Sequence, residues 1–311
     1  MIVVESLSRY YGDFAAIENL TFQIDSKEVV GFLGLNGAGK STTLKILATL
    51  LSPSNGKIEI DGTDLESAPV SFRSQIGFLP EEPPLYKEMT VKGFLGHVAQ
   101  LRGMPPSEFT QRFPTVIEQC HLKGKEEAVI NTLSLGYRKR VGIAQAIIHN
   151  PKLIILDEPI SGLDPLQIAE MRSVIRALST NATVLLSSHN LNEVSETCDK
   201  LLILNNGRLI AQGTTAELAS NLSESNIRIE AELVGSRKDI EKHLSEIEAI
   251  QSFDVEEERE DSLIVGIALN QIQPETLVPL LVERSIGLRA LQNAKSELEE
   301  IFISLTKGGS Q

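Results

Sequence analysis

Aromatic side chains, cysteines and long apolar runs are all scarce in this 311-residue chain, which is 5% aromatic with no tryptophan and has two cysteines. No apolar run approaches the roughly 18 residues that span a bilayer, so we expect no transmembrane helix. The start, Met1–Glu5, lacks the basic residues and apolar stretch of a signal peptide, so we expect the chain to remain in the cytosol. Cys120 and Cys198 have no metal-binding spacing, and we expect reduced, partly buried thiols.

Basic residues are also in deficit, because 29 Lys and Arg stand against 42 Asp and Glu, a net charge of −13. This balance argues against a protein held to nucleic acid or anionic lipid by bulk electrostatics, and we expect no nucleic-acid partner. Residues 1–220 hold 20 basic and 24 acidic residues, whereas residues 221–311 hold 9 and 18. The shift predicts a first domain over 1–220 and a second, acidic domain over 221–311.

The most informative motif is a glycine-rich loop between an expected strand, Val29–Leu33, and an expected helix, Thr42–Leu51. Residues 34–42 fit G-x-x-x-x-G-K-[ST], a loop whose backbone N–H groups surround phosphates. We expect Lys40 to reach the β- and γ-phosphates and the Ser41 hydroxyl to hold Mg²⁺. The other expected phosphate-site residues are Asn36, Gly37, Ala38, Gly39 and Thr42.

Strand and helix patterns alternate along the first domain, which predicts an α/β fold with a largely parallel sheet covered on both faces. A turn at Asp61-Gly62 predicts an early hairpin, and residues 201–210 predict a second one. Residues of about 85–150 have a helical pattern that we interpret as a helical insertion. Strands are expected over 1–4, 16–24, 29–33, 153–156, 183–187 and 200–204, with helices from near Pro165 and Asn190.

The acidic C-terminal third has the order βαββαβ followed by a helix, which predicts a small α+β, ferredoxin-like module. Its strands are expected over 226–234, 250–256, 261–269 and 287–292, and its helices over 236–247, 274–285 and 296–306.

Two adjacent carboxylates, Asp157 and Glu158, follow the apolar segment Leu153–Leu156. A buried strand would deliver both side chains to the carboxyl edge of the sheet, where ligands of α/β proteins bind. There Asp157 would hold Mg²⁺ through water and Glu158 would polarise an attacking water. Strand ends often carry exposed acids too, so this pair alone does not decide between the two interpretations.

Three further motifs occur in a fixed order around this pair: Leu133–Arg140 (LSLGYRKR), Ser161–Asp164 (SGLD) and a strand end at Ser188-His189. With the glycine loop they make residues 1–215 resemble the ATP-binding-cassette (ABC) ATPases. The resemblance implies a P-loop NTPase (RecA-like) core with an antiparallel β subdomain and the helical insertion. It also implies ATP hydrolysis with Mg²⁺, in which Lys40, Glu158 and His189 are the catalytic residues.

The resemblance assigns roles residue by residue. Tyr11 matches the aromatic residue that stacks on adenine, although Tyr10 is a close competitor. His189 matches the histidine that contacts the γ-phosphate and helps to place the water. Ser134 and Gly136 match positions that meet the γ-phosphate bound to the opposite subunit of a homodimer. Asp164 matches the residue that links the two sites.

The chain departs from the common family pattern at two motifs. Glu81 stands where glutamine is usual and is expected near Mg²⁺ or water, with Glu82 as the alternative. The signature has Leu135 and Tyr137 in place of glycine and glutamine. At these two motifs and in the closing segment 296–306, the sequence resembles one subgroup of the family. Its members, which include gliding-motility and antibiotic- or ion-efflux ATPases, serve separate permease chains in export.

The resemblance therefore implies a nucleotide-binding subunit on the cytoplasmic face of a membrane, driving a permease on a separate chain. The alternative is a cytosolic, non-transport ABC ATPase that acts on a macromolecular assembly. Many of those carry two cassettes or long coiled-coil insertions, and this chain has one cassette and no such insertion. The acidic module could be a ligand sensor, a dimer brace or inert packing.

Overall fold

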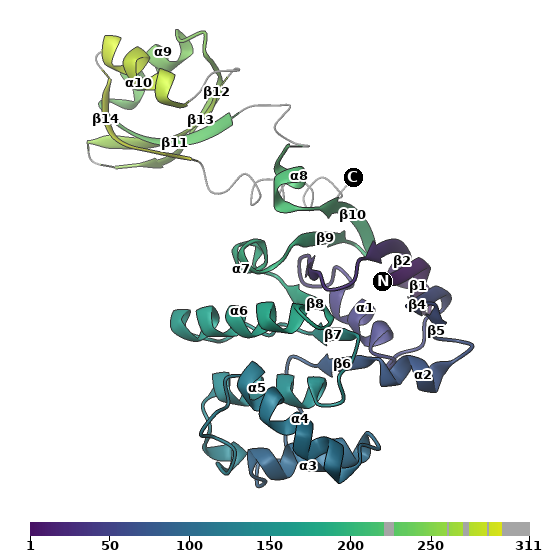
Figure 1. Cartoon of the computed structure of the whole chain (residues 1–311). Helices are drawn as coiled ribbons and strands as arrows, with labels where there is room; N and C mark the ends of the chain where they lie inside the picture. Colours follow the sequence, from purple (N-terminus) through teal and green to yellow (C-terminus); the bar gives the residue numbers. More distant parts are fainter. Residues whose placement is uncertain (221–226, 260, 270–273, 285, 294–311) are drawn as a thin grey trace. The chain divides into compact units, whose positions relative to one another are not determined.

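The computed structural model describes residues 1–220, 227–259, 261–269, 274–284 and 286–293 (Figure 1). The chain forms two compact units, the first over Met1–Thr215 and the second beginning at Ala216. The α/β fold class is confirmed, with a P-loop core, an antiparallel β subdomain, a helical insertion and a small α+β module.

The described strands of the first unit build a sheet in the order β10-β9-β3-β8-β7-β6. Neighbours from β9 to β6 run parallel, and β10 runs antiparallel to β9. Burial on both faces explains why β3 and β7 are unbroken apolar runs. The strands are β3 Val29–Leu33, β6 Ile76–Leu79, β7 Leu153–Leu156, β8 Thr183–Ser188, β9 Lys200–Asn205 and β10 Arg208–Gly213.

A second, antiparallel sheet has the order β2-β1-β4-β5. The expected Asp61-Gly62 turn is confirmed, because Ile60 pairs with Thr63 and both turn residues have positive φ. Leu7, Ile17, Phe32, Leu44 and Leu47 belong to one buried cluster, which joins this sheet, helix α1 and the parallel sheet. The bounds are β1 Ile2–Tyr11, β2 Phe14–Ile24, β4 Asn55–Ile60, β5 Thr63–Asp64, α1 Lys40–Leu47 and α2 Pro69–Ser74.

The helical insertion consists of α3 (Val91–Leu101), α4 (Pro106–Gln119), the 3₁₀ turn η1 (Ile130–Thr132) and α5 (Leu135–Ile147). Helix α5 packs directly on β6, where a Cβ at Gly77 would lie 2.1 Å from the carbonyl oxygen of Ala146. Only glycine permits this approach. The insertion is thereby fixed against the parallel sheet through α5.

Helices α6 (Pro165–Ser179) and α7 (Leu191–Thr197) pack on β3 and β8. Helix α8 spans Thr215–Ser220. Among the described residues, no helix is long and apolar enough to cross a membrane.

The second unit contains a sheet in the order β12-β13-β11-β14, antiparallel throughout. The predicted βαββαβ order is confirmed within the described residues. A buried cluster that includes Ile229, Leu244, Ile267 and Leu281 joins this sheet to its two helices. The predicted last helix, 296–306, lies outside the described residues. The elements are β11 Ile227–Val234, α9 Arg237–Ser245, β12 Ile250–Glu258, β13 Ser262–Leu269, α10 Pro274–Glu283 and β14 Gly287–Asn293.

Candidate functional site

Four adjacent parallel strands end at the same edge of the sheet and deliver the candidate residues together. The glycine loop begins at Gly34 after β3, and His189 follows β8 directly. Asp157 follows β7, and Glu81 lies two residues beyond the end of β6. Because β3, β8, β7 and β6 are neighbours in this order, motifs far apart in the sequence meet at one carboxyl edge.

The glycine loop folds into the first turn of α1. Gly39 is the N-cap, with φ 101°, and a Cβ there would lie 2.8 Å from the carbonyl oxygen of Ala16. The helix therefore begins at Lys40, not at Thr42 as the pattern predicted. Lys40, Ser41 and Thr42 consequently form the first turn, whose N–H groups point out of the helix end and favour an anion.

Lys40 is buried and folded back on its own loop. Its Nζ donates to the carbonyl oxygens of Gly34, at 2.5 Å, and Leu35, at 3.2 Å. Burial lowers the pKa of Lys40, while the carboxylates of Glu158 and Asp157 raise it in opposition. A buried ammonium held by two carbonyls of the glycine loop can form charge-assisted bonds with a polyanion such as a triphosphate.

A serine that sequence reasoning did not single out joins the two adjacent carboxylates. Ser187 Oγ donates to Asp157 Oδ1 at 2.6 Å and accepts from the backbone N–H of Glu158 at 2.9 Å. Asp157 and Ser187 are both buried. Glu158 has φ 47°, a left-handed conformation that few residues other than glycine adopt. The serine therefore orients Asp157 and holds the strained backbone of Glu158.

The side chain of Glu158 pairs with His189. The Nδ1 atom of His189 lies 3.1 Å from both carboxylate oxygens of Glu158. The glutamate side chain is 12% exposed and the histidine side chain 57% exposed. The pair is thus a carboxylate at the base of the site in contact with an imidazole at its opening.

The glycine loop, Glu158 and His189 line a cleft of about 510 Å³. Of the sequence alternatives, Tyr11 and Glu81 line the cleft, whereas Tyr10 and Glu82 are not among the described residues that line it. Phe14, which pairs with Tyr11 across the β1–β2 hairpin, was not predicted. The lining is Leu35, Asn36, Gly37, Gly39, Lys40, Ser41 and Thr42 of the loop, with Tyr11, Phe14, Ala16, Glu81, Glu158 and His189.

Five candidate residues are not among the described residues that line this cleft. Two of them, Ala38 and Asp157, are buried next to lining residues in the sequence, and the other three lie at the starts of α5 and α6. Ser134 is the N-cap of α5 and accepts from the N–H of Tyr137. Asp164 is the N-cap of α6 and accepts from the N–H of Gln167 at 2.9 Å. A Cβ at Gly136 would lie 2.9 Å from Oε1 of Gln167, so the two helix starts are in contact. Ser134, Gly136 and Asp164 are thus grouped together but do not line their own subunit's cleft.

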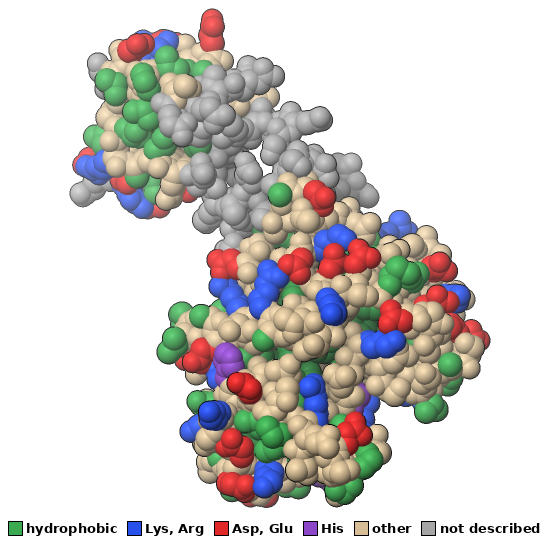
Figure 2. Space-filling view, viewed as in Figure 1, with side chains coloured by type: hydrophobic (Ala, Val, Ile, Leu, Met, Phe, Trp, Pro, Cys, Tyr) green, Lys and Arg blue, Asp and Glu red, His purple; other side chains and the backbone are tan. Residues whose placement is uncertain are grey.

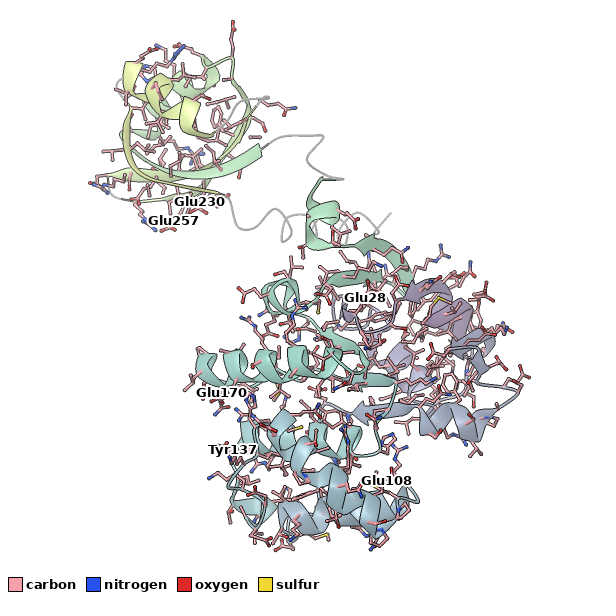
Figure 3. The ribbon with its side chains drawn as sticks, viewed as in Figure 1. Glu28, Glu108, Tyr137, Glu170, Glu230 and Glu257 are labelled. Carbon is pink, nitrogen blue, oxygen red and sulfur yellow. The ribbon has the colours of Figure 1, made fainter. Side chains whose placement is uncertain are left out.

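Tyr137, one of the two signature departures, packs between cations. Its ring centroid lies 5.0 Å from the guanidinium carbon of Arg140 and 5.2 Å from Nζ of Lys125. Arg140 in turn pairs with Glu170 of α6. Tyr137 and Glu170 are labelled in Figure 3. The tyrosine therefore belongs to a contact between α5 and α6, a packing role that its position in the motif did not reveal.

On the face of the first unit seen in Figure 2, Lys and Arg side chains are interspersed with Asp and Glu side chains. That face therefore offers no broad surface of one charge.

Comparison with known proteins agrees with this geometry. A family model described as ABC transporter matches residues 17–161. The chain is 31% identical to the daunorubicin/doxorubicin resistance ATP-binding protein DrrA of Streptomyces peucetius, over 98% of this chain and 92% of that protein. It is 30% identical to the bacitracin transport ATP-binding protein BcrA of Bacillus licheniformis, over 100% of this chain and 98% of that protein. A solved ATP-binding subunit of an ABC transporter is 35% identical, with a TM-score of 0.64, over 72% of this chain and 93% of that one.

Proposed function

This chain belongs to the family of ABC transporter ATP-binding proteins, and on that premise we propose that it is the ATPase subunit of an exporter whose permease is a separate chain. The observation that carries the proposal is the length of the matches to DrrA and BcrA, which extend over the C-terminal unit. Those two relatives are named for drug resistance and bacitracin transport. We therefore propose that the exported compound is an antibiotic or a related drug.

For nucleotide binding, we propose that Tyr11 stacks on adenine and that Lys40 and the first turn of α1 hold the phosphates. The open cleft and the buried ammonium support this arrangement. Ser41, Asp157 and Glu81 would hold Mg²⁺, which would neutralise phosphate charge. Within the described part of the chain, no three His, Cys, Asp or Glu side chains form a metal cluster, so the nucleotide's own oxygens would complete the coordination.

For hydrolysis, we propose that Glu158 accepts a proton from the attacking water and that His189 orients Glu158 and contacts the γ-phosphate. The 3.1 Å contact between the two side chains supports this division of roles. Ser134, Gly136 and Asp164 would act on the nucleotide of a second subunit in a homodimer. None of the three is among the described residues that line the cleft of their own subunit, which supports a role in trans.

We further propose that residues 1–220 are the ATP-binding domain, with a helical subdomain over about 85–150, and that residues 221–311 are an accessory domain. The subunit would lie on the cytoplasmic face of the membrane, held there by its permease.

Replacing Ser187 with alanine should lower the turnover number for ATP about 10- to 100-fold, the range that the loss of a supporting hydrogen bond at a metal ligand produces. The change removes the bond to Asp157 and the acceptor for the N–H of Glu158. Steady-state ATPase kinetics measure the effect. Ser74→Ala, whose hydroxyl bonds the carbonyl of Ser71 on α2, is the control and should leave turnover within about twofold.

The exporter proposal is tested by deleting the gene and restoring it in cells exposed to bacitracin-like peptides and anthracyclines. Deletion should increase sensitivity to at least one compound, the parent chain should restore resistance, and Lys40→Ala should not. A tagged chain should also co-purify with a multi-span protein from detergent-solubilised membranes. Unchanged sensitivity, together with co-purification of a soluble assembly alone, would instead support the non-transport alternative.

A further inference from the structure

A lysine of α5, the helix that begins within the LSLGYRKR signature and is called the signature helix below, contacts the loop that follows β7. Lys139 lies on α5 and is 4% exposed. Its Nζ donates to the backbone carbonyl of Glu158 at 2.8 Å and to that of Ser161 at 2.7 Å. These carbonyls belong to the first and last residues of a turn over 158–161, which begins at the second carboxylate of the Asp157-Glu158 pair and is closed by a bond from the N–H of Ser161 to the carbonyl of Glu158. One cation of the helical insertion thus bridges this turn of the sheet domain.

The surroundings of Lys139 make this contact costly to lose. Burial lowers the pKa of Lys139, and the carboxylates of Glu81, Glu158 and Glu193 raise it in opposition. A buried ammonium is tolerated only when its hydrogens have acceptors. Without it, the carbonyl of Ser161 would lose its 2.7 Å donor, and three carboxylates would lose a neighbouring cation beside a site that fits a polyanion.

The bond to Glu158 falls on a strained residue. Glu158 has φ 47°, its N–H donates to Ser187 and its carbonyl accepts from Lys139. Both peptide groups of this residue are therefore held, which keeps a left-handed conformation that costs free energy. The side chain that contacts His189 extends from this fixed backbone.

We propose that Lys139 is a positioning residue that holds Glu158 in its catalytic orientation and joins it to the signature helix. The helix that carries Lys139 begins at Ser134, so movement of the Ser134 end is transmitted to the glutamate of the same subunit. The inference rests on the proposed function, in which Ser134 contacts the nucleotide of the second subunit and Glu158 is the base. Engagement of one nucleotide by Ser134 then favours hydrolysis of the other.

Lys139→Met is the first test, because methionine is an unbranched side chain only one atom shorter than lysine and has no hydrogen-bond donor. The turnover number should fall at least about tenfold with KM for ATP within about threefold, as expected when only the orientation of the base is lost. Lys139→Arg, which can donate to both carbonyls, should recover most of the rate. Arg112→Met is the control: Arg112 of α4 bonds the carbonyl of Ile147 at the other end of α5, so its loss should change turnover less than about twofold.

A double-mutant cycle separates positioning from general stability. If Lys139 acts through Glu158, Lys139→Met should add less than about twofold to the loss caused by Glu158→Gln in single-turnover hydrolysis. A multiplicative loss, or a parent-like rate for Lys139→Met alone, overturns the inference. If Lys139→Met does not fold, as judged by circular dichroism, Lys139→Gln enters the same cycle. The ATPase activity of the parent chain is measured beside these variants. An inactive parent would contradict the proposed function itself, whereas an active parent with the wrong variant rates would contradict only the role of Lys139.

Discussion

Glu158→Gln should lower the turnover number for ATP by about 10²- to 10⁴-fold, the range for loss of a general base. Glutamine keeps the size of the side chain and can still contact His189, but it cannot accept a proton from water. The backbone bonds of this residue to Ser187 and Lys139 do not depend on the side chain. Nucleotide affinity should therefore stay within about threefold of the parent value, as expected when only a transition-state interaction is removed.

The change is measured by single-turnover hydrolysis of radiolabelled ATP, with affinity measured by titration of a fluorescent analogue. Glu82→Gln makes the same substitution one residue after Glu81, at a side chain that is not among the described cleft-lining residues. It should leave turnover within about twofold. A parent rate for Glu158→Gln would show that the base has been assigned to the wrong residue.

Lys40→Ala should weaken ATP binding by about 100-fold and abolish measurable turnover, because a charge-assisted bond to phosphate is lost. The conformation of the glycine loop also depends on Lys40, because its ammonium donates to the carbonyls of Gly34 and Leu35. Removing it leaves these carbonyls without that donor and loosens the loop that would surround the phosphates. The loss should therefore appear in affinity as well as in the rate.

Isothermal titration with ATP measures this prediction directly. Lys45→Ala is the matched control, because Lys45 lies in the last turn of the same helix, away from the phosphate end. Its affinity should remain within about twofold of the parent value. Equal affinities for the parent and for Lys40→Ala would mean that the glycine loop does not hold the nucleotide.

Some elements could be predicted from the sequence because their local pattern is unambiguous. Val29–Leu33 and Leu153–Leu156 have the predicted bounds, since short apolar runs bounded by polar or turn residues are typical of buried parallel strands. Strand β1 is longer than the predicted 1–4, since Ser6 has φ 50° and the pairing register shifts between Val4 and Leu7. Such a bulge interrupts the alternation on which the prediction depended.

Strand β6 and helix α2 were not predicted at all. The strand Ile76–Leu79 contains Gly77, and a glycine weakens the sequence pattern of a strand. Glycine is needed there because α5 packs closely against it, and such a tertiary contact is not visible in the local sequence. Helix α2 has six residues, too few to show a helical period.

At the site, the individual residues could be predicted from the sequence motifs, but the contacts between those residues could not. Ser187 and Lys139 bond residues 30 and 19 positions away, and no local spacing encodes such pairs. Ser187 could have been found from its position near the end of the strand that precedes His189. Parallel strands that carry site residues at their carboxyl ends lie side by side, so a polar side chain near such an end is expected to be close to the site. The choice between Tyr10 and Tyr11 required the structure, because it depends on which face of strand β1 borders the cleft.

ATP-dependent pairing of two subunits is measured as the mass of the Glu158→Gln chain in solution with and without ATP, by light scattering after size-exclusion chromatography. We expect a monomer of 34.0 kDa without nucleotide and a species of about twice that mass with ATP, binding one ATP per chain. Adding Ser134→Arg, which would place a bulky side chain against the partner's phosphate, should return the protein to a monomer. A chain that stays monomeric at saturating ATP, with or without Mg²⁺, would contradict the central claim that two subunits close on shared nucleotides.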